Sequence, residues 1–263
     1  MARLRKTDRR EQILMELRHH PHVRTSELAA RFGVSTETVR RDVEALSGEG
    51  LIQRAYGGAS AAPMGAQPPF GERDRAHIEE RAQIARRAAD LVRPGEVLMI
   101  DAGSTTHQFA SALAASAHDL TVLTNSVAVA SALAQNETIQ VIICPGDFMA
   151  REVGIYGAET IDFIGRYNAN RAFIGASGLT ASGITEANRL AVGVKRAMLR
   201  QSHESYLLVD HSKFGVNLVA TVEPLSALTG IVTDDRPAGL LEKALADFRV
   251  DVYLAAQEQP VRT

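Results

Sequence analysis

The sequence predicts an α/β protein in two modules: a small, mostly helical module at the amino terminus and a larger domain built on an open, mostly parallel sheet. Three observations lead to this prediction. Apolar residues recur at helical spacing in the amino-terminal segment, a stretch rich in alanine, glycine and proline follows, and short apolar runs then alternate with helical patterns. The 263 residues, 45% of them hydrophobic, are enough for two domains with separate cores.

The amino-terminal module is predicted to hold three helices and a strand that runs into a glycine turn. Helical spacing covers 8–19, 23–32 and 36–48, and the strand with its turn covers 51–59. Gly33 is expected to end the second helix, and Ser35 is a favourable N-cap for the third. Two helices joined by a sharp glycine turn and followed by a small wing are typical of a winged helix-turn-helix.

The rest of the chain predicts a linker and a sheet domain. Residues 59–71 lack periodicity, so we expect a linker there, between a module at 1–58 and a domain at 72–258. A long charged helix is expected over 72–92. Apolar runs separated by helical patterns then predict strands at 97–100, 120–123, 139–143, 172–174, 206–209, 230–233 and 252–254.

Composition narrows the class of protein. The formal net charge of -2 conceals an asymmetry, because residues 1–60 carry 11 Lys+Arg and 8 Asp+Glu, which leaves a net +3 there and -5 in the remainder. The single cysteine, Cys144, cannot form an internal disulfide. No apolar run approaches the roughly 18 residues of a membrane helix, and no signal peptide is visible. We therefore expect a cytoplasmic protein without membrane contact, metal site or cofactor.

The third predicted helix displays a DNA-reading set of side chains. Thr36, Thr38, Arg40 and Arg41 lie off its apolar face, and hydroxyl and guanidinium groups are the donors that base edges and phosphates accept. The alternative is an ordinary solvated helix face, with the arginines paired to acidic neighbours such as Asp42 and Glu44. The order of the surrounding elements favours the DNA-reading interpretation.

The run 97–107 predicts an anion site in the larger domain. A buried strand leads through Asp101 and Gly103 to the hydroxyl residues Ser104, Thr105 and Thr106 at the start of a helix. Backbone N–H groups at a helix N-terminus bind phosphate readily. An ordinary capped strand-to-helix turn is an equal alternative for this segment alone. The segment matches neither a Walker loop nor a dinucleotide-binding fingerprint.

Other predicted strands also end in polar residues, where open sheets bind ligands. Lys213 stands out among these residues because only four of the 29 basic residues are lysines. It lies close to Asp210 in sequence and could be a cation placed for an anionic ligand. With these two residues, the strand-end set comprises Thr124, Asn125, Ser126, Gly146, Asp210 and Lys213.

The amino-terminal motifs closely resemble the DNA-binding signature of DeoR-type bacterial transcription regulators. The resemblance rests on 27–46, with its string Thr-Val-Arg-Arg-Asp, and on the glycine-rich wing at 50–59. By this resemblance the helical set would contact operator DNA and the wing would approach the DNA backbone. The implied contact residues are Ser35, Thr36, Thr38, Arg40, Arg41, Arg54, Tyr56 and Gly57.

The larger domain also resembles these regulators, whose sensor domain is similar in fold to ribose-5-phosphate isomerase. The resemblance implies a homo-oligomer, dimer or tetramer, that senses a phosphorylated sugar or polyol and is released from its operator on binding it. It rests on 101–106, 124–126 and 210–214. The implied effector-binding residues are Asp101, Gly103, Ser104, Thr105, Thr106, Thr124, Asn125, Ser126, Gly146, Asp210 and Lys213.

The sequence departs at two places from the motifs of the family and of the isomerase, and both places bear on the predicted ligand site. Pro145 stands where the family commonly has glycine, and it removes one backbone N–H from the loop at Gly146. The segment 175–179 lacks the acid pair that carries catalysis in the isomerase, so we expect ligand binding without turnover and no catalytic residues.

Two alternatives remain. The first is a sugar-phosphate isomerase or CoA-transferase-like enzyme with an accessory DNA-binding domain. The second is a constitutive DNA-binding protein whose sensor fold has lost its ligand.

Overall fold

The computed structural model describes residues 6–20, 22–48, 52–61 and 67–255. The chain divides into two compact units, Met1–Pro68 and Pro69–Thr263, which are described separately below.

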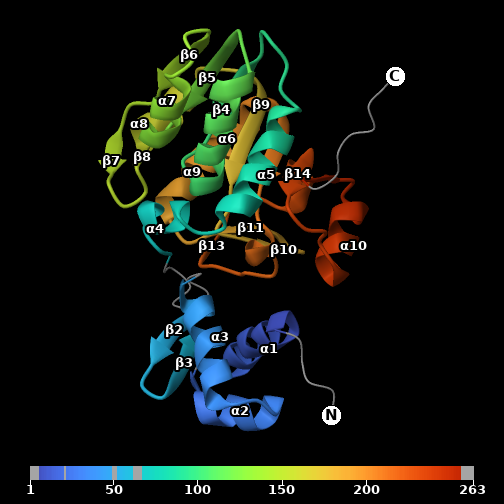
Figure 1. Ribbon diagram of the computed structural model, residues 1–263. Coiled ribbons are helices and arrows are strands. Elements are labelled where there is room, and N and C mark those ends of the chain that lie inside the picture. Colours follow the sequence, from blue (N-terminus) through green and yellow to red (C-terminus); the bar gives the residue numbers. More distant parts are fainter. Residues whose placement is uncertain (1–5, 21, 49–51, 62–66, 256–263) are drawn as a thin grey trace. The chain divides into compact units, whose positions relative to one another are not determined.

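The amino-terminal unit is a winged helix-turn-helix (Figure 1). Its sheet is antiparallel, with the order β1-β3-β2. Confirmed here are the predicted first and third helices and the strand with its glycine turn. The elements are α1 Lys6–His19, β1 His22–Arg24, α2 Thr25–Phe32, α3 Thr36–Gly48, β2 Ile52–Ala55 and β3 Gly58–Ala61.

Turn chemistry sets the geometry of the two adjoining helices. Gly33 ends α2 with φ 64°, a left-handed conformation that glycine adopts without a Cβ penalty. Ser35 caps α3, because its Oγ accepts the Thr38 N–H at 3.2 Å. Val39, with 0% exposure, is at the centre of the core between the helices and the sheet.

The prediction that the second helix begins at Val23 was wrong. Val23 and Arg24 belong to β1, where Val23 pairs with Ala59 of β3 and buries its side chain. A β-branched side chain that pairs across strands favours the extended form over a helix start. The expected boundary at residue 58 falls on the first residue of β3, and 62–66 of the expected linker lie outside the described residues.

The second unit is an α/β domain around a seven-stranded parallel sheet with the order β15-β14-β12-β9-β4-β5-β6. All seven predicted apolar runs form its strands. The elements are α4 Phe70–Asp74, α5 Ile78–Ala89, β4 Val97–Ile100, α6 Ser104–Ser116, β5 Leu120–Thr124, α7 Val127–Leu133, β6 Ile139–Ile143, β7 Asp147–Met149, β8 Gly154–Tyr156, α8 Ala158–Ile164, β9 Ala169–Gly175, β10 Gly178–Thr180, β11 Gly183–Glu186, α9 Arg189–Arg200, β12 Ser202–Leu208, η1 His211–Lys213, β13 Ala220–Thr221, η2 Leu225–Ala227, β14 Gly230–Thr233, α10 Gly239–Asp247 and β15 Asp251–Leu254.

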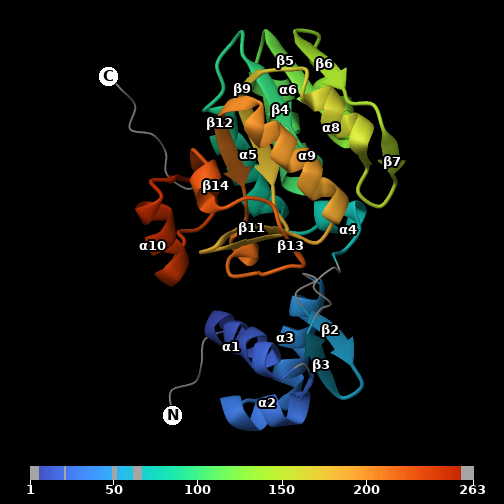
Figure 2. The same ribbon diagram turned by 180° about the vertical axis from the view of Figure 1, so that it is seen from behind.

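Helices cover both faces of this sheet. Leu98 and Ile100 of β4 pack into the core that includes residues of α5, α6 and α7. Met99, between them, points to the opposite core, which includes residues of α8 and α9. Figure 1 shows α5 and α6 on one side, and the reverse view in Figure 2 shows α8 and α9 on the other. Burial on both faces explains the nearly continuous apolar runs of the strands.

The prediction of one helix over 72–92 was wrong, because the structure has two helices, α4 and α5. Between them His77 adopts φ 52°, a left-handed conformation that interrupts a helix. Arg81 stabilises the break, since its Nη1 donates to the Ala76 carbonyl at 2.8 Å and to the Arg73 carbonyl. The guanidinium satisfies carbonyls that a continuous helix would have used internally.

Short strands that the hydrophobic pattern did not reveal lie outside the main sheet. Strands β7 and β8 form an antiparallel hairpin, and β10, β11 and β13 form a small antiparallel sheet. Each has two to four residues, which is too short for a two-residue period to stand out.

The buried pair between Arg9 and Asp42 ties α1 to α3 and gives a stability prediction. Arg9 Nε donates to Asp42 Oδ2 at 2.5 Å, and the Asp42 side chain is 3% exposed. In the Asp42→Ala variant the buried guanidinium loses this carboxylate, which costs about 3–5 kcal/mol. In calorimetry of the full chain, we expect the melting temperature of the amino-terminal unit to fall and that of the second unit to stay unchanged.

Glu44→Ala is the matched control, because the exposed Glu44 pairs with Arg54 at a longer 3.7 Å. Such surface pairs contribute about 1 kcal/mol or less. Equal melting temperatures for Asp42→Ala and Glu44→Ala would contradict the structural role of the buried pair.

Candidate functional site

The surface of α3 presents the predicted DNA-reading side chains to solvent. Ser35, Thr36, Arg40 and Arg41 are exposed, and Thr38 is half-buried. The side chains of Arg40 and Arg41 are 61% and 77% exposed. The hydroxyls of Ser35 and Thr38 lie 2.8 Å apart. The first turns of α3 therefore carry hydroxyl and guanidinium groups on one accessible surface.

The acidic partners of these arginines differ from those that the sequence suggested. Arg40 Nη1 lies 3.0 Å and Arg41 Nε 3.5 Å from the carboxylate of Glu37. Asp42 instead turns inward to Arg9. Because exposed ion pairs contribute little free energy, the contacts with Glu37 leave both guanidinium groups available to another anion.

The wing carries the other predicted DNA-contacting residues. The Tyr56 side chain is fully exposed at the tip of the β2–β3 turn. Gly57 adopts φ 72°, and its carbonyl accepts hydrogen bonds from the N–H of Thr25 at 3.0 Å and from its hydroxyl at 3.1 Å. Arg54, on β2, has a side chain that is 63% exposed.

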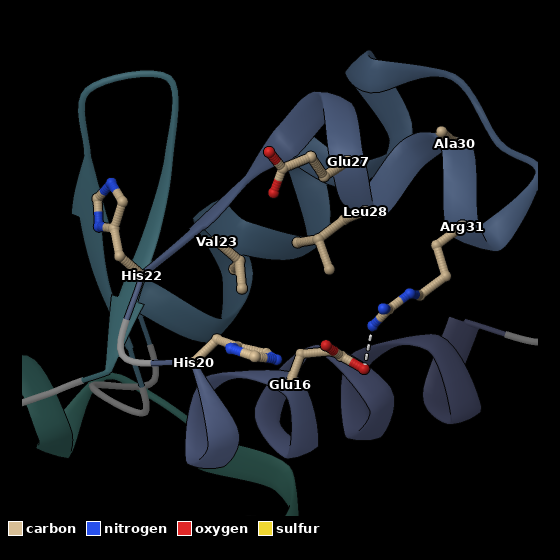
Figure 3. Close-up of a pocket in the computed structure, with 8 residues that line it drawn as sticks. All are labelled: Glu16, His20, His22, Val23, Glu27, Leu28, Ala30 and Arg31. Carbon is tan, nitrogen blue, oxygen red and sulfur yellow. Dashed lines mark ion pairs between the residues drawn. The ribbon is translucent and has the colours of Figure 1, made fainter.

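A separate groove of about 550 Å³ opens between α1, α2 and β1 (Figure 3). In Figure 3 the Glu16 carboxylate forms an ion pair with the Arg31 guanidinium across the groove. None of the lining residues belongs to the predicted DNA-contacting set. They are Glu16, His20, His22, Val23, Glu27, Leu28, Ala30 and Arg31.

In the second unit, the predicted ligand residues gather at the carboxyl edge of the main sheet. The chain runs from β4 to β5 and β6 on one side, whereas β9 pairs with β4 on the other. Strand order reverses between β4 and β9, and open α/β sheets bind ligands outside such a switch point. Asp101 follows β4, and Gly175 ends β9.

A buried cluster of three charged side chains occupies this switch point. Lys195 Nζ donates to Asp101 Oδ2 and, at 2.9 Å, to the Gly175 carbonyl, and it lies 3.6 Å from Glu186 Oε2. Asp101 Oδ1 accepts the Gly175 N–H at 2.9 Å. Glu186 Oε1 accepts the N–H of Ala187 at 2.9 Å.

Burial and charge pull the pKa values of this cluster in opposite directions. Burial raises the pKa of Asp101 above its ordinary value, and Lys195 partly offsets this rise. For Lys195, burial lowers the pKa, but Asp101 and Glu186 more than compensate and the net shift is upward. The lysine therefore stays charged between the two carboxylates.

Sequence reasoning missed Lys195 as a site residue, although it is one of only four lysines in the chain. It lies on α9, 94 residues from Asp101, and neither residue has a local motif that points to the other. Glu186 closes β11 and meets the same lysine. Two carboxylates, Asp101 from the loop after β4 and Glu186 from β11, therefore lie on either side of Lys195 although segment 175–179 itself has no acidic residue.

Several of the side chains predicted to contact the ligand form hydrogen bonds to the backbone near the switch point. The Thr106 hydroxyl donates to the carbonyls of Asp101 at 2.8 Å and Gly103 at 3.0 Å. The Asn125 side chain accepts the Ala102 N–H at 3.0 Å and donates to the Ile155 carbonyl at 2.9 Å. These contacts fix the loop that leads into α6.

The hydroxyls on either side of Asn125 have comparable structural roles. Thr124 Oγ1 accepts the Ser126 N–H at 3.0 Å, and Ser126 Oγ caps α7 by accepting the Val129 N–H at 3.2 Å. All three side chains of the predicted Thr-Asn-Ser group therefore shape the edge of the sheet.

The first turn of α6 carries the predicted anion cradle. Ser104 and Thr105 begin the helix, with exposures of 4% and 9%. Gly103 precedes them in an extended conformation, and a Cβ there would lie 3.1 Å from Thr106 Oγ1. Backbone N–H groups of a first helical turn have no acceptor within the helix, so they can bind an anion.

Gly146 lies in the loop after β6, at φ 133°. A Cβ there would lie 2.6 Å from the Tyr156 carbonyl, so both its conformation and its surroundings require glycine. The preceding Pro145 has no N–H to offer a ligand, and its carbonyl accepts the Thr160 hydroxyl at 2.7 Å.

Asp210 and Lys213 lie after β12, at the same edge. Asp210 is 1% exposed; its Oδ1 accepts the Ser212 N–H at 3.1 Å, and its Oδ2 lies 3.5 Å from Arg81 Nη2. Burial raises the pKa of Asp210, but Lys213 and Arg81 more than compensate, so the carboxylate is ionised. Lys213 is half-buried in η1, and Arg81 supplies a second cation that the sequence did not suggest.

Within the described ranges, no group of three or more His, Cys, Asp or Glu side chains could hold a metal ion. None of the helices in the described part of the chain is both long and apolar enough to cross a membrane. Cys144 is buried, and burial raises the pKa of its thiol to about 12.

Both units match known family models. A DeoR-like helix-turn-helix domain matches residues 9–63, and a DeoR C terminal sensor domain matches residues 76–235. The glycerol-3-phosphate regulon repressor of Escherichia coli (strain K12) is 32% identical over 252 residues, which cover 95% of this chain and 100% of that protein. The HTH-type transcriptional regulator IolR of Bacillus subtilis (strain 168) is 33% identical over 237 residues, 90% of this chain and 94% of that one.

The similar solved structures have low sequence identity and TM-scores below 0.5. Ribose 5 phosphate isomerase A from Neisseria gonorrhoeae has a TM-score of 0.39 and 17% identity, over 51% of this chain and 52% of that chain. The tetrameric eIF2B-beta2-delta2 complex from C. thermophilum has a TM-score of 0.49 and 14% identity, over 90% of this chain and 71% of that chain.

The pair of His211 and Asp234 at the carboxyl edge makes stability depend on pH. The hydrogen bond to Asp234 raises the pKa of His211 from 6.5 to about 9, although burial opposes the rise. Because the folded pKa lies above the unfolded one, the stabilisation is complete below pH 6.5 and is lost as pH rises through about 9. We expect the melting temperature of the wild type to fall over this window.

The His211→Gln variant lacks the titrating group, so its melting temperature should fall less between pH 6.5 and 9. An NMR titration of the His211 ring in the wild type provides the direct check. Parallel melting curves for the two proteins over this window would contradict the prediction.

Proposed function

This chain belongs to the DeoR family of DNA-binding transcriptional regulators, and from that premise we propose that it represses genes of carbohydrate metabolism until a phosphorylated sugar or polyol releases it. The observation that carries the proposal is the pairing of an exposed DNA-reading helix in one unit with a helix N-terminus at a sheet switch point in the other. The first suits operator DNA, and the second suits a phosphate.

The DNA-binding part rests on α3 and the wing. The guanidinium groups of Arg40 and Arg41 are exposed in the amino-terminal half of α3, where they can donate to base edges or phosphates. Arg54 and the exposed Tyr56 on the wing would contact the DNA backbone. An operator with two half-sites binds two DNA-binding domains, so we propose that the protein is a homo-oligomer, a dimer or tetramer. We also propose that it acts in the cytoplasm.

The effector-binding part rests on the carboxyl edge of the sheet. The N-terminus of α6 would hold the phosphate, supported by Ser104 and Thr105 and by the cations Lys213 and Arg81. The named relatives include a glycerol-3-phosphate regulon repressor, which favours a phosphorylated polyol or sugar as the effector class. The carboxylates of Asp101 and Glu186 are acceptors for the hydroxyl groups of such a ligand.

We propose that the ligand is bound without turnover. Proton transfer next to a carbonyl needs a base that can take up a proton, and in this cluster the candidate bases are the carboxylates of Asp101 and Glu186. Both oxygens of Asp101 already accept hydrogen bonds, and Glu186 is held by Lys195 and by a backbone N–H.

The rival enzyme function, a sugar-phosphate isomerase, draws support from the same buried acid pair. A coupled assay of the full chain with ribose 5-phosphate separates the two functions. Turnover that disappears in Asp101→Asn would establish the isomerase in place of the pure sensor.

The Arg41→Ala variant tests the DNA-reading helix. Because the side chain is 77% exposed, we expect unchanged folding and loss of specific operator binding, by about tenfold or more. Footprinting on a duplex selected by the wild type from a random pool measures this effect. Arg31→Ala is the control, since it removes an exposed arginine of the same unit outside the predicted contact set. Wild-type protection by Arg41→Ala would refute the assignment.

A thermal-shift screen tests the effector site. We expect sugar or polyol phosphates to raise the melting temperature of the second unit, by an amount corresponding to about 2.7 kcal/mol at a hundredfold excess over Kd. The unphosphorylated polyols should have no such effect. Lys213→Gln should reduce the shift, whereas Lys243→Gln, an exposed lysine of α10, should leave it unchanged. No stabilisation by any phosphorylated compound, with DNA binding retained, would defeat the sensor assignment.

A further inference from the structure

Helix α4 is docked across the carboxyl edge of the sheet by contacts to the β7–β8 loop. The Phe70 N–H donates to the Arg151 carbonyl at 2.9 Å. The Arg73 guanidinium forms an ion pair with Glu152 in the same loop, and both side chains are close to 90% buried. Figures 1 and 2 show α4 beside the β7–β8 hairpin.

The last residue of α4, Asp74, places its carboxylate near the His107 imidazole and the Arg81 guanidinium. Its Oδ1 lies 3.0 Å from His107 Nδ1, and His107 belongs to the start of α6. The Phe70 ring packs edge-on against the same imidazole, with 5.7 Å between the centroids. Burial lowers the pKa of Arg81, and the Asp74 carboxylate is one of the charges that oppose this shift, so it lies within electrostatic reach of that guanidinium.

The buried Arg81 guanidinium is a second feature that points to a ligand near α4. Its side chain is 3% exposed, and Nε has no hydrogen-bond partner within the described residues. Its Nη1 holds the carbonyls of Arg73 and Ala76, and its Nη2 lies a long 3.5 Å from Asp210. Buried guanidinium N–H groups are ordinarily satisfied, so this one points to an acceptor from outside the protein chain.

We propose that Asp74 is a built-in competitor of the effector's anionic group, and that the bound anion undocks α4. The inference rests on the effector site proposed at the N-terminus of α6. A phosphate bound there, close to His107 in the first turns of α6, repels the Asp74 carboxylate and replaces it as the hydrogen-bond partner of the imidazole. Asp74 then leaves His107, and the contacts of Phe70 and Arg73 weaken with it.

The position of α4 in the chain makes this exchange a regulatory step. Helix α4 begins at Phe70, shortly after β3 of the DNA-binding unit ends, and it is separated from α5 by the left-handed His77. The docked or undocked state of α4 therefore sets where the chain leaves the sensor domain. An effector that binds the undocked state more tightly lowers operator affinity, and operator binding lowers effector affinity by the same factor.

The Asp74→Asn variant removes the competing charge and keeps the size of the side chain. Calorimetric titration of the full chain with inorganic phosphate and with glycerol 3-phosphate should show about threefold to tenfold tighter binding than in the wild type. Its operator affinity without phosphate should fall toward that of the phosphate-saturated wild type. Glu72→Gln removes an exposed charge of the same helix and should match the wild type in both measurements. Asp74→Glu, which keeps the charge, should stay close to the wild type.

Hydrogen exchange of the wild type supplies a readout that does not depend on a variant. Saturating phosphate should speed exchange of the amides of residues 70–77 while it slows exchange at the start of α6. Phosphate binding with unchanged exchange in α4, or equal affinities of Asp74→Asn and the wild type, overturns the inference and leaves the effector site standing. No binding of either probe to any of the proteins overturns both.

Discussion

The buried contact between Lys195 and Asp101 is the constraint on which the sensor domain depends. It joins the end of β4 to α9, and the same lysine holds the Gly175 carbonyl at the end of β9 and approaches Glu186 at the end of β11. Removing one partner of such a buried pair costs about 3–5 kcal/mol. The loop that leads from Asp101 into α6 is therefore held at a set place and angle, and the N-terminus of α6 is positioned with it.

Local chemistry made much of the fold predictable. Burial on both faces of the main sheet produces apolar runs, and all seven runs became its strands. The left-handed Gly33 and the cap at Ser35 are likewise encoded within a few residues. The errors lie where residues outside the local segment determine the secondary structure. Val23 belongs to a strand because it pairs with Ala59 of β3. The helix predicted over 72–92 is interrupted where the Arg81 guanidinium donates to the Ala76 carbonyl.

For the candidate site, the sequence predicted which residues gather at the sheet edge better than it predicted what each side chain contacts. The rule that ligands bind beyond the carboxyl ends of parallel strands located the edge at Asp101, Asn125 and Asp210. It could not show that the Asn125 amide would form hydrogen bonds with the backbone of two loops. Nor could it show that Lys195, 94 residues away in sequence, would contact Asp101. Side chains that hold a site and side chains that bind its ligand share the same polar chemistry, so only their partners in space separate them.

The energetics of the two sides of the site differ in a way that suits a switch. On the buried side of the site, the side chains of Lys195 and Asp101 are almost completely buried, and separating them would leave a buried charge on each without a partner of opposite sign. On the more exposed side, α4 is held by the ion pair of Arg73 with Glu152 and by the contact of Asp74 with His107. The Asp74 side chain is 26% exposed. Burial raises the pKa of Glu152 and Arg73 only partly offsets this, so desolvation cancels much of the attraction in that pair. An anion that displaces Asp74 acts on a partly exposed contact of α4, whereas the buried cluster of Lys195 and Asp101 stays in place to define the site.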